Sequence, residues 1–205
     1  MNSLAGLLLL FPFFMMAVIV HEVSHGWVAL RLGDTTSLDA GRLTLNPLRH
    51  IDPVGTILLP FLLLLVKSPF LFGWAKPVPI NVLNLRHPRQ DMLWVGIAGP
   101  VANFTLAAAV AFLLKILGPG TPPLLTALAN YLILVNLVLG TFNLIPIPPL
   151  DGSRVLTALL PSRFARWLYR MERWGIVLVD LLLTFGLIHR FLWPVVEFLA
   201  RLLGV

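Results

Sequence analysis

The chain has 205 residues, of which 58% are hydrophobic and 12% are charged; its net charge is +6 and its mean hydropathy is +0.90. Long apolar runs separated by basic loops predict a polytopic membrane protein and leave no room for a large soluble domain. Because the basic residues flank the apolar segments, membrane topology and anionic lipid explain the positive charge better than nucleic-acid binding does. Because the chain contains no cysteine, disulfides and thiolate metal ligands are excluded, and a zinc site would need histidine and carboxylate.

The first apolar segment, residues 4–32, is long enough to span a membrane as one helix, with a kink expected at Pro12. It contains the pattern His-Glu-x-x-His at His21, Glu22 and His25. Residues four apart share a face of a helix, so the two imidazoles can bind one metal ion, and Glu22 is placed to take a proton from a metal-bound water. Polar side chains this deep in an apolar helix are costly and usually mark function. The alternative is that the two histidines only hydrogen-bond to neighbouring helices.

Residues 33–53 form a polar, turn-rich stretch. Apolar and polar residues alternate within it, which predicts a small β-hairpin near 38–47 at the membrane surface. His50 and Asp52 have the right chemistry for metal ligands. Nothing fixes them on the face of the histidine pair, however, so we expect them to be ordinary polar groups of a loop.

Residues 54–66 are apolar but number only thirteen, and they contain Gly55 and Pro60. This length is short for a full span and predicts a re-entrant segment or a hairpin arm. The stretch that follows, 67–90, contains too many prolines for a helix.

Two long apolar helices are expected next, at 92–117 and 124–142, and the tight loop between them predicts antiparallel packing. The first contains Gly99 and Pro100, a pair that predicts a kink and a close approach to a neighbouring helix. After the second, closely spaced prolines break the helix and leave the chain extended as far as Asp151.

Near the C-terminus, residues 162–173 carry arginines on one helical face and apolar side chains on the other, which predicts an amphipathic interfacial helix. Residues 174–188 form a last expected span, and residues 191–203 are short enough to lie on the surface or insert partly. The predicted fold is therefore an all-α polytopic membrane protein with about four full transmembrane helices. The expected organisation is a single domain at 1–205, with a catalytic core at about 4–160 and C-terminal helices at 162–205.

The distribution of basic residues indicates how these segments cross the membrane. If the N-terminus lies outside and residues 54–66 do not cross fully, every lysine and arginine except Lys115, Arg190 and Arg201 faces the cytoplasm. The positive-inside rule favours this arrangement. It also brings Asp151 to the end of the bundle where the His-Glu-x-x-His pattern lies, so we expect a multi-pass protein of the cell membrane with its site toward the cytoplasm.

A catalytic zinc site commonly uses three protein ligands and leaves one position for water, so a carboxylate has to complete this one. Asp151 is the best candidate, because it lies in a proline-rich break at membrane depth, where a carboxylate is otherwise costly; Asp180, within the last expected span, is the alternative. Hydrolysis also needs an oxyanion donor, which Asn143 could supply. Asn103 could hold the backbone of a substrate. For both asparagines the alternative is hydrogen bonding between helices.

Three motifs in this order resemble the site-2 protease family of intramembrane zinc metalloproteases: HEVSH in the first apolar helix, GIAGPVAN in the next long one, and NLIPIPPLDG after the one that follows. The compact form, without a PDZ or CBS domain, is most similar to the small bacterial and archaeal members. The resemblance implies one zinc ion per chain, held by His21, His25 and Asp151. It also implies that Glu22 is the general base and that Asn143 acts on the oxyanion.

The resemblance further implies hydrolysis of a peptide bond within or near a transmembrane segment of another membrane protein, in regulated intramembrane proteolysis, and a location in a prokaryotic plasma membrane. A helical peptide bond is shielded by its own hydrogen bonds, so the substrate has to unwind locally. We expect the unwound strand to pair with the edge of the predicted hairpin. The sequence leaves open the identity of the substrate, the cleavage position and the oligomeric state.

Other functions fit parts of the pattern. A different class of His-Glu-x-x-His membrane protease would need a later glutamate ligand, but Glu172 and Glu197 lie in basic or surface-like segments. A non-proteolytic zinc-binding membrane protein, or an inactive relative that only holds substrate, is the second alternative. An inactive relative would most simply have lost Glu22, which is present, and a transporter would place ionisable groups along a path rather than at one site.

Overall fold

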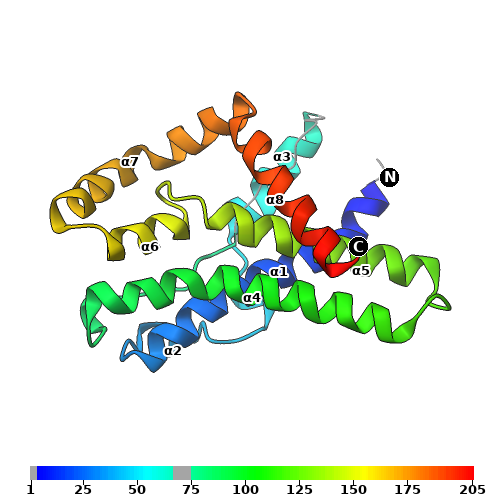
Figure 1. The fold of residues 1–205 in the computed structure, drawn as a ribbon, viewed down its shortest axis with the longest axis horizontal. Coiled ribbons are helices and arrows are strands. Elements are labelled where there is room, and N and C mark those ends of the chain that lie inside the picture. Colours follow the sequence, from blue (N-terminus) through cyan, green and yellow to red (C-terminus); the bar gives the residue numbers. More distant parts are fainter. Residues whose placement is uncertain (1–3, 67–74) are drawn as a thin grey trace.

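The computed structural model describes residues 4–66 and 75–205, and the regular structure in these two stretches is entirely helical (Figure 1). Its α-helices are α1 (Leu4–Arg31), α2 (Thr36–Asp39), α3 (Leu59–Leu65), α4 (Pro88–Leu117), α5 (Pro123–Asn143), α6 (Asp151–Leu159), α7 (Ser162–Thr184) and α8 (Leu187–Leu203). A short π-helix, Pro53–Leu58, precedes α3, and 3-10 turns occupy Pro47–Arg49 and Val82–Asn84.

Three of these helices are long and apolar enough to cross a membrane: α1 from Leu9, α4 and α5. α7 and α8 meet the same criterion only together and are bent by 76° where they join, so they form either one broken span or a re-entrant pair. The described part of the chain therefore has three candidate spans, or up to four, which agrees with the predicted class of an α-helical multi-pass membrane protein.

The predicted division of the C-terminal region at residue 173 is wrong, because α7 continues without a break to Thr184. Gly175 stands near the expected boundary but serves a close contact, since a Cβ there would lie 2.2 Å from the carbonyl oxygen of Pro148. The chain turns instead at Gly186, whose φ of +68° suits glycine. The arginine-rich half and the apolar half are thus one helix.

α4 is the central helix of the bundle and makes its most extensive contacts with α5, α1 and α6 (Figure 1). Small side chains on α4 allow neighbouring backbones to come close, which is how helices commonly associate in lipid. One buried cluster joins α4 to α5 and α8, so the C-terminal residues pack on the bundle. Its members are Ala107, Ala111, Ile133, Leu137 and Val196.

The small β-hairpin predicted near 38–47 is wrong, because these residues form the turn of α2 and an irregular loop. Side-chain hydrogen bonds take the place of strand pairing. The Asp34 carboxylate accepts from the backbone N–H and the hydroxyl of Thr36, and His50 Nε2 donates to the Thr44 carbonyl oxygen at 2.8 Å. Such local bonds compete with regular structure in turns. Without a strand here, the expected pairing of a substrate with its edge loses its basis.

The buried carboxylate of Asp34 also joins this loop to the extended stretch that precedes α4. It accepts hydrogen bonds from the Asn81 backbone N–H at 2.7 Å and from Asn84 Nδ2 at 3.0 Å. Burial alone would raise the pKa of this carboxyl, but the hydrogen bonds that it accepts hold the pKa below its usual value. Asp34 therefore stays ionised and fixes the extended stretch against the end of α1.

Residues 54–66, predicted to be re-entrant or a hairpin arm, form the π-helix and α3. Asp52 caps this helical segment by accepting from the backbone N–H groups of Val54 and Gly55, at 3.0 and 2.7 Å, which is an ordinary structural role for an aspartate. The segment is too short to cross as a single α-helix, and its re-entry stays a prediction.

Candidate metal centre

Two helices bring the three predicted zinc ligands to one buried point. His21 and His25 lie one turn apart on α1, and Asp151 is the first residue of α6; their exposed fractions are 6%, 3% and 5%. Asp151 Oδ2 lies 3.0 Å from His21 Nε2 and 3.1 Å from His25 Nε2, and the two Nε2 atoms are 3.0 Å apart. Within residues 4–66 and 75–205, no other three histidine or acidic side chains form such a cluster.

The donor set fits a zinc ion. Zinc in proteins is held tetrahedrally by imidazole nitrogen and carboxylate oxygen at about 2.0–2.2 Å, so neighbouring ligand atoms are expected roughly 3.3 Å apart. The observed spacings of 3.0 to 3.1 Å are close to that value.

The orientation of the two rings supports the same conclusion. His25 Nδ1 lies 2.6 Å from the Val95 carbonyl oxygen, which can only accept, and His21 Nδ1 lies 2.6 Å from Asn103 Oδ1. With hydrogens on Nδ1, both Nε2 atoms direct lone pairs toward each other and toward the carboxylate of Asp151. Electron-rich atoms at this spacing repel unless a cation lies among them, so the arrangement favours a metal.

Prolines determine where Asp151 lies. α5 ends at Asn143, and the three prolines within 144–150 cannot continue a helix, so α6 begins anew at Asp151. The Oδ2 atom of Asp151 faces the Nε2 atoms of both histidines. Its second oxygen, Oδ1, lies 3.3 Å from Arg154 Nη1. The carboxylate therefore lies between the two histidines and an arginine.

Two glycines allow the backbone to close around the cluster. A Cβ at Gly99 of α4 would lie 2.4 Å from His25 Nε2 and 2.6 Å from His21 Nε2. A Cβ at Gly152 would lie 2.2 Å from the Leu144 carbonyl oxygen. Because no Cβ approaches nitrogen or oxygen so closely, both positions require glycine. Both glycines stand in the motifs noted above, but nothing in the sequence alone indicates that either one lines the site.

We expect Gly99→Ala to weaken zinc binding by more than about tenfold, because the added methyl group would displace both imidazoles. The measurement is the zinc affinity of the purified metal-free protein, in competition with a chromophoric chelator. Gly120→Ala is the matched control, since a Cβ there meets nothing within 4 Å, and it should bind zinc as the parent does. Equal affinities for the two variants would contradict the tight contact between α4 and the histidine pair.

Glu22 lies next to His21 but outside the cluster. Its partly buried side chain accepts a hydrogen bond on Oε2 from the backbone N–H of Val78, at 2.9 Å. Val78 belongs to the extended stretch 75–81, which therefore runs along α1 beside the histidines. The carboxylate therefore lies near the candidate ligands without belonging to their cluster, a position that a general base could occupy; this role of Glu22 stays a prediction.

The two asparagines predicted to act on substrate have different surroundings. Asn103 is fully buried on α4; its Oδ1 faces His21, and its Nδ2 donates to the Ala17 carbonyl oxygen at 3.1 Å, so its amide orients the histidine ring. Asn143, the last residue of α5, donates from Nδ2 to the Leu139 carbonyl oxygen at 3.0 Å. Contact of either asparagine with substrate stays a prediction.

The other residues weighed as ligands lie apart from the cluster. Asp180 is exposed on α7, Asp52 caps a helical segment, and the His50 ring bonds to a loop carbonyl. None of them belongs to the group of ligand atoms. The fold therefore brings Asp151, and not Asp180, to the two imidazoles.

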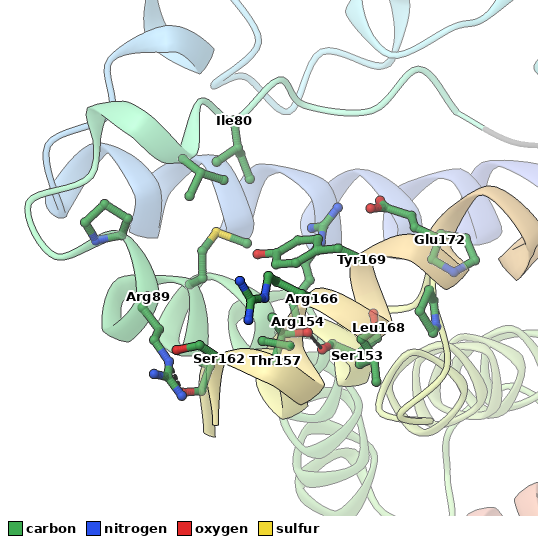
Figure 2. A pocket seen from close by; sticks show the side chains of 17 residues that line it. Ile80, Arg89, Ser153, Arg154, Thr157, Ser162, Arg166, Leu168, Tyr169 and Glu172 are labelled. Carbon is green, nitrogen blue, oxygen red and sulfur yellow. Dashed lines mark hydrogen bonds between the residues drawn. The ribbon is translucent and has the colours of Figure 1, made fainter. Parts of the chain in front are cut away.

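A cavity of about 480 Å³ adjoins the cluster, between the start of α4, the extended stretch before it, α6 and α7. Figure 2 shows Arg154, Arg166 and Tyr169 on its wall and Arg89 on the side of α4. Arg154 also contacts Asp151, so the wall of the cavity and the metal centre share one arginine. The volume is within the range of about 300–1,000 Å³ typical of ligand pockets.

The chain resembles known proteins that are named as zinc metalloproteases, and the family model that matches it is that of a peptidase family. The family described as "Peptidase family M50" matches residues 121–187. The chain is 38% identical over 199 residues to "Putative zinc metalloprotease YwhC" of Bacillus subtilis, which covers 92% of this chain and 87% of the relative. It is 28% identical over 191 residues to "Putative zinc metalloprotease Rip2" of Mycolicibacterium smegmatis, covering 93% of this chain and 72% of the relative.

A more distant relative is "Zinc metalloprotease MJ0392" of Methanocaldococcus jannaschii, 26% identical over 166 residues, covering 80% of this chain and 38% of the relative. No solved structure matches the chain significantly. The similarity to the first relative extends over nearly the whole of both proteins. The chain therefore belongs to peptidase family M50, the site-2 protease family, and is an intramembrane zinc metalloprotease.

Proposed function

We propose that the protein hydrolyses a peptide bond within or near a transmembrane segment of another membrane protein, with one zinc ion held by His21, His25 and Asp151. The observation that carries this proposal is the convergence of two imidazole nitrogens and one carboxylate oxygen, 3.0 to 3.1 Å apart, in a buried site. Zinc bound there supplies a Lewis acid and a water of lowered pKa. A non-proteolytic zinc-binding role is not favoured, because relatives similar over most of the chain are named as zinc metalloproteases.

Glu22 is the proposed general base. Its carboxylate would take a proton from the water that attacks the scissile carbonyl. It would then give that proton to the amine that leaves when the C–N bond breaks. The hydrogen bond from the Val78 N–H fixes one of its oxygens, which limits the orientations that the carboxylate can adopt.

Asn143 is the proposed oxyanion donor. An amide nitrogen carries two hydrogens, and the Leu139 carbonyl takes one of those on Asn143. The second can donate to the oxygen that becomes negative during the reaction, which is the group that such a donor stabilises. The position of Asn143 at the end of α5, just before the break that leads to Asp151, supports this role.

We also propose that the metal centre faces the cytoplasmic side. α2, the start of α4 and α6 lie toward the same end of the molecule (Figure 1), and this end carries Arg31, Arg89 and Arg154. Basic residues accumulate on the cytoplasmic side of short membrane loops, which supports this orientation. A cut here would release the substrate fragment into the cytoplasm.

Removal of the metal tests the proposal. We expect the protein in liposomes to cleave a single-span reporter with a central Gly-Pro pair, and a zinc chelator to lower the rate by at least about 100-fold. One equivalent of zinc should restore the rate. A reporter with Leu-Leu in place of Gly-Pro should be cleaved more slowly, because its helix unwinds less readily.

Two results would overturn the proposal. One is cleavage that continues at the parent rate after the zinc content has fallen below a small fraction of one ion per chain. The other is failure to cleave any Gly-Pro reporter when zinc is bound at one ion per chain.

A further inference from the structure

A buried asparagine on α5, Asn136, lies at the end of a chain of hydrogen bonds that starts at the metal centre. Asn103 Nδ2 donates to Asn136 Oδ1 at 2.8 Å, and Asn136 Nδ2 donates to the Leu132 carbonyl oxygen of its own helix, also at 2.8 Å. Asn136 and Asn103 both have an exposed fraction of 0%. Asn136 belongs neither to the ligand cluster nor to any of the three sequence motifs, and it was not singled out from the sequence.

The surroundings of Asn136 are otherwise apolar. Ile133 and Leu137, its near neighbours on α5, are fully buried in the cluster that joins α4, α5 and α8. A polar side chain in such a place is costly unless its donors and acceptors are all used. A leucine would pack there without this cost, so the presence of an asparagine indicates that its side-chain amide has a function.

Backbone carbonyls fix the direction of every bond in the chain. The Leu132 carbonyl can only accept, so the nitrogen of the Asn136 amide faces it and the oxygen faces Asn103. That oxygen can only accept as well, so Asn103 has to present its nitrogen, which also donates to the Ala17 carbonyl oxygen. The remaining oxygen of Asn103 then faces His21 Nδ1 at 2.6 Å. Since this oxygen too can only accept, the hydrogen of His21 lies on Nδ1.

The consequence lies at the other nitrogen of the ring. With its hydrogen on Nδ1, neutral His21 has its lone pair on Nε2, the atom that faces His25 and Asp151. Groups behind a metal ligand commonly set its tautomer and orientation in this way, and their loss costs roughly 10- to 100-fold in metal affinity. For His25 the Val95 backbone carbonyl does this directly, whereas His21 depends on two side-chain amides.

We propose that Asn136 is a positioning residue for the metal centre: it fixes the Asn103 amide, which fixes the His21 tautomer that can bind zinc. The inference rests on the proposed function only in taking His21 as a zinc ligand. The side chain of Asn136 bonds to Asn103 and to the Leu132 carbonyl oxygen and to none of the three candidate ligands, so its effect reaches the centre through Asn103.

The test compares three variants by zinc affinity and by the tautomer of His21. Asn136→Leu removes the acceptor for Asn103 and should lower the zinc affinity of the metal-free protein by about 10- to 100-fold. Asn136→Asp should stay within about threefold of the parent, because a protonated carboxyl accepts from Asn103 and donates to the Leu132 carbonyl, and an ionised one still accepts. Ile133→Ala, a packing change in the same cluster, should lower the unfolding temperature without this loss of affinity.

Nitrogen-15 NMR of histidine-labelled, metal-free protein gives a readout that does not involve zinc. The parent and Asn136→Asp should show His21 with its hydrogen on Nδ1, and Asn136→Leu should show a mixture of tautomers. If Asn136→Leu does not fold, Asn136→Ala removes the same acceptor without adding bulk and should also give a mixture of His21 tautomers.

An unchanged tautomer together with unchanged zinc affinity in Asn136→Leu or Asn136→Ala would overturn the inference. So would an equal loss of zinc affinity in Ile133→Ala, since packing alone would then account for the effect. A different result would show that the proposed zinc site itself is wrong: His21→Ala would then bind zinc as tightly as the parent. In that case the tautomer of His21 in the Asn136 variants would still show whether Asn136 positions the ring.

Discussion

Glu22→Gln is expected to abolish cleavage while leaving zinc bound. The amide has the shape of the carboxylate, and its oxygen can still accept the hydrogen bond from the Val78 N–H that Glu22 accepts at 2.9 Å. It cannot take up a proton at neutral pH, so the rate should fall by about 10²- to 10⁴-fold, the contribution typical of general acid–base catalysis. The measurement pairs the cleavage rate of the Gly-Pro reporter with the zinc content of the same sample.

Glu197→Gln provides the matched control. Glu197 lies on α8, where its carboxylate pairs with Arg201 at the protein surface. Its replacement should therefore change neither the cleavage rate nor the zinc content. A Glu22→Gln variant that cleaves at the parent rate would rule Glu22 out as the base. Loss of zinc together with loss of cleavage would instead assign Glu22 a part in holding the metal.

Asp151→Ala is expected to lose zinc and cleavage together. The change removes the only carboxylate of the cluster and leaves two neutral imidazoles beside Arg154, whose guanidinium then has no counter-charge at 3.3 Å. Because loss of an outer-shell partner already costs about 10- to 100-fold in metal affinity, loss of a direct ligand should cost more than about 100-fold. Zinc titration of the metal-free variant measures this effect.

Asp180→Ala distinguishes the two carboxylates that the sequence left as candidates. Asp180 is exposed on α7 and lies outside the cluster, so this variant should bind and cleave as the parent does. If Asp180→Ala lost zinc while Asp151→Ala kept it, the assignment of the third ligand would be reversed.

Helical periodicity and proline chemistry were enough to predict the parts of this site. The spacing of His21 and His25 places them on one face of any helix, and the prolines before Asp151 force a break wherever the surrounding fold lies. The arrangement of basic residues suggested that these parts meet at one end of the bundle. Each of these three inferences depends on local geometry or on the bilayer, and none of them requires knowledge of packing.

The errors and omissions lie where packing or side-chain bonding decides. The sequence alternates near residues 42–46, but the His50 ring bonds to the Thr44 carbonyl oxygen and the Thr44 hydroxyl accepts from the Asn46 N–H, so side-chain bonds hold this loop without strand pairing. Gly175 permits α7 to continue because it packs on Pro148 instead of ending the helix. The proposed role of Asn136 depends on which face of α5 meets Asn103, and the sequence of a mostly apolar helix with three asparagines does not reveal that face.

The distance along the chain between the zinc ligands has a consequence for the whole molecule. Asp151 is 130 positions from His21 and 126 from His25, so an ion shared among them acts as a cross-link between the beginning of the fold and its last third. A ligand that binds only the native state stabilises it by about 4 kcal/mol when its free concentration is a thousand times its dissociation constant. Metal starvation would then reduce the amount of enzyme as well as its turnover, because unlinked chains would unfold and be degraded more often.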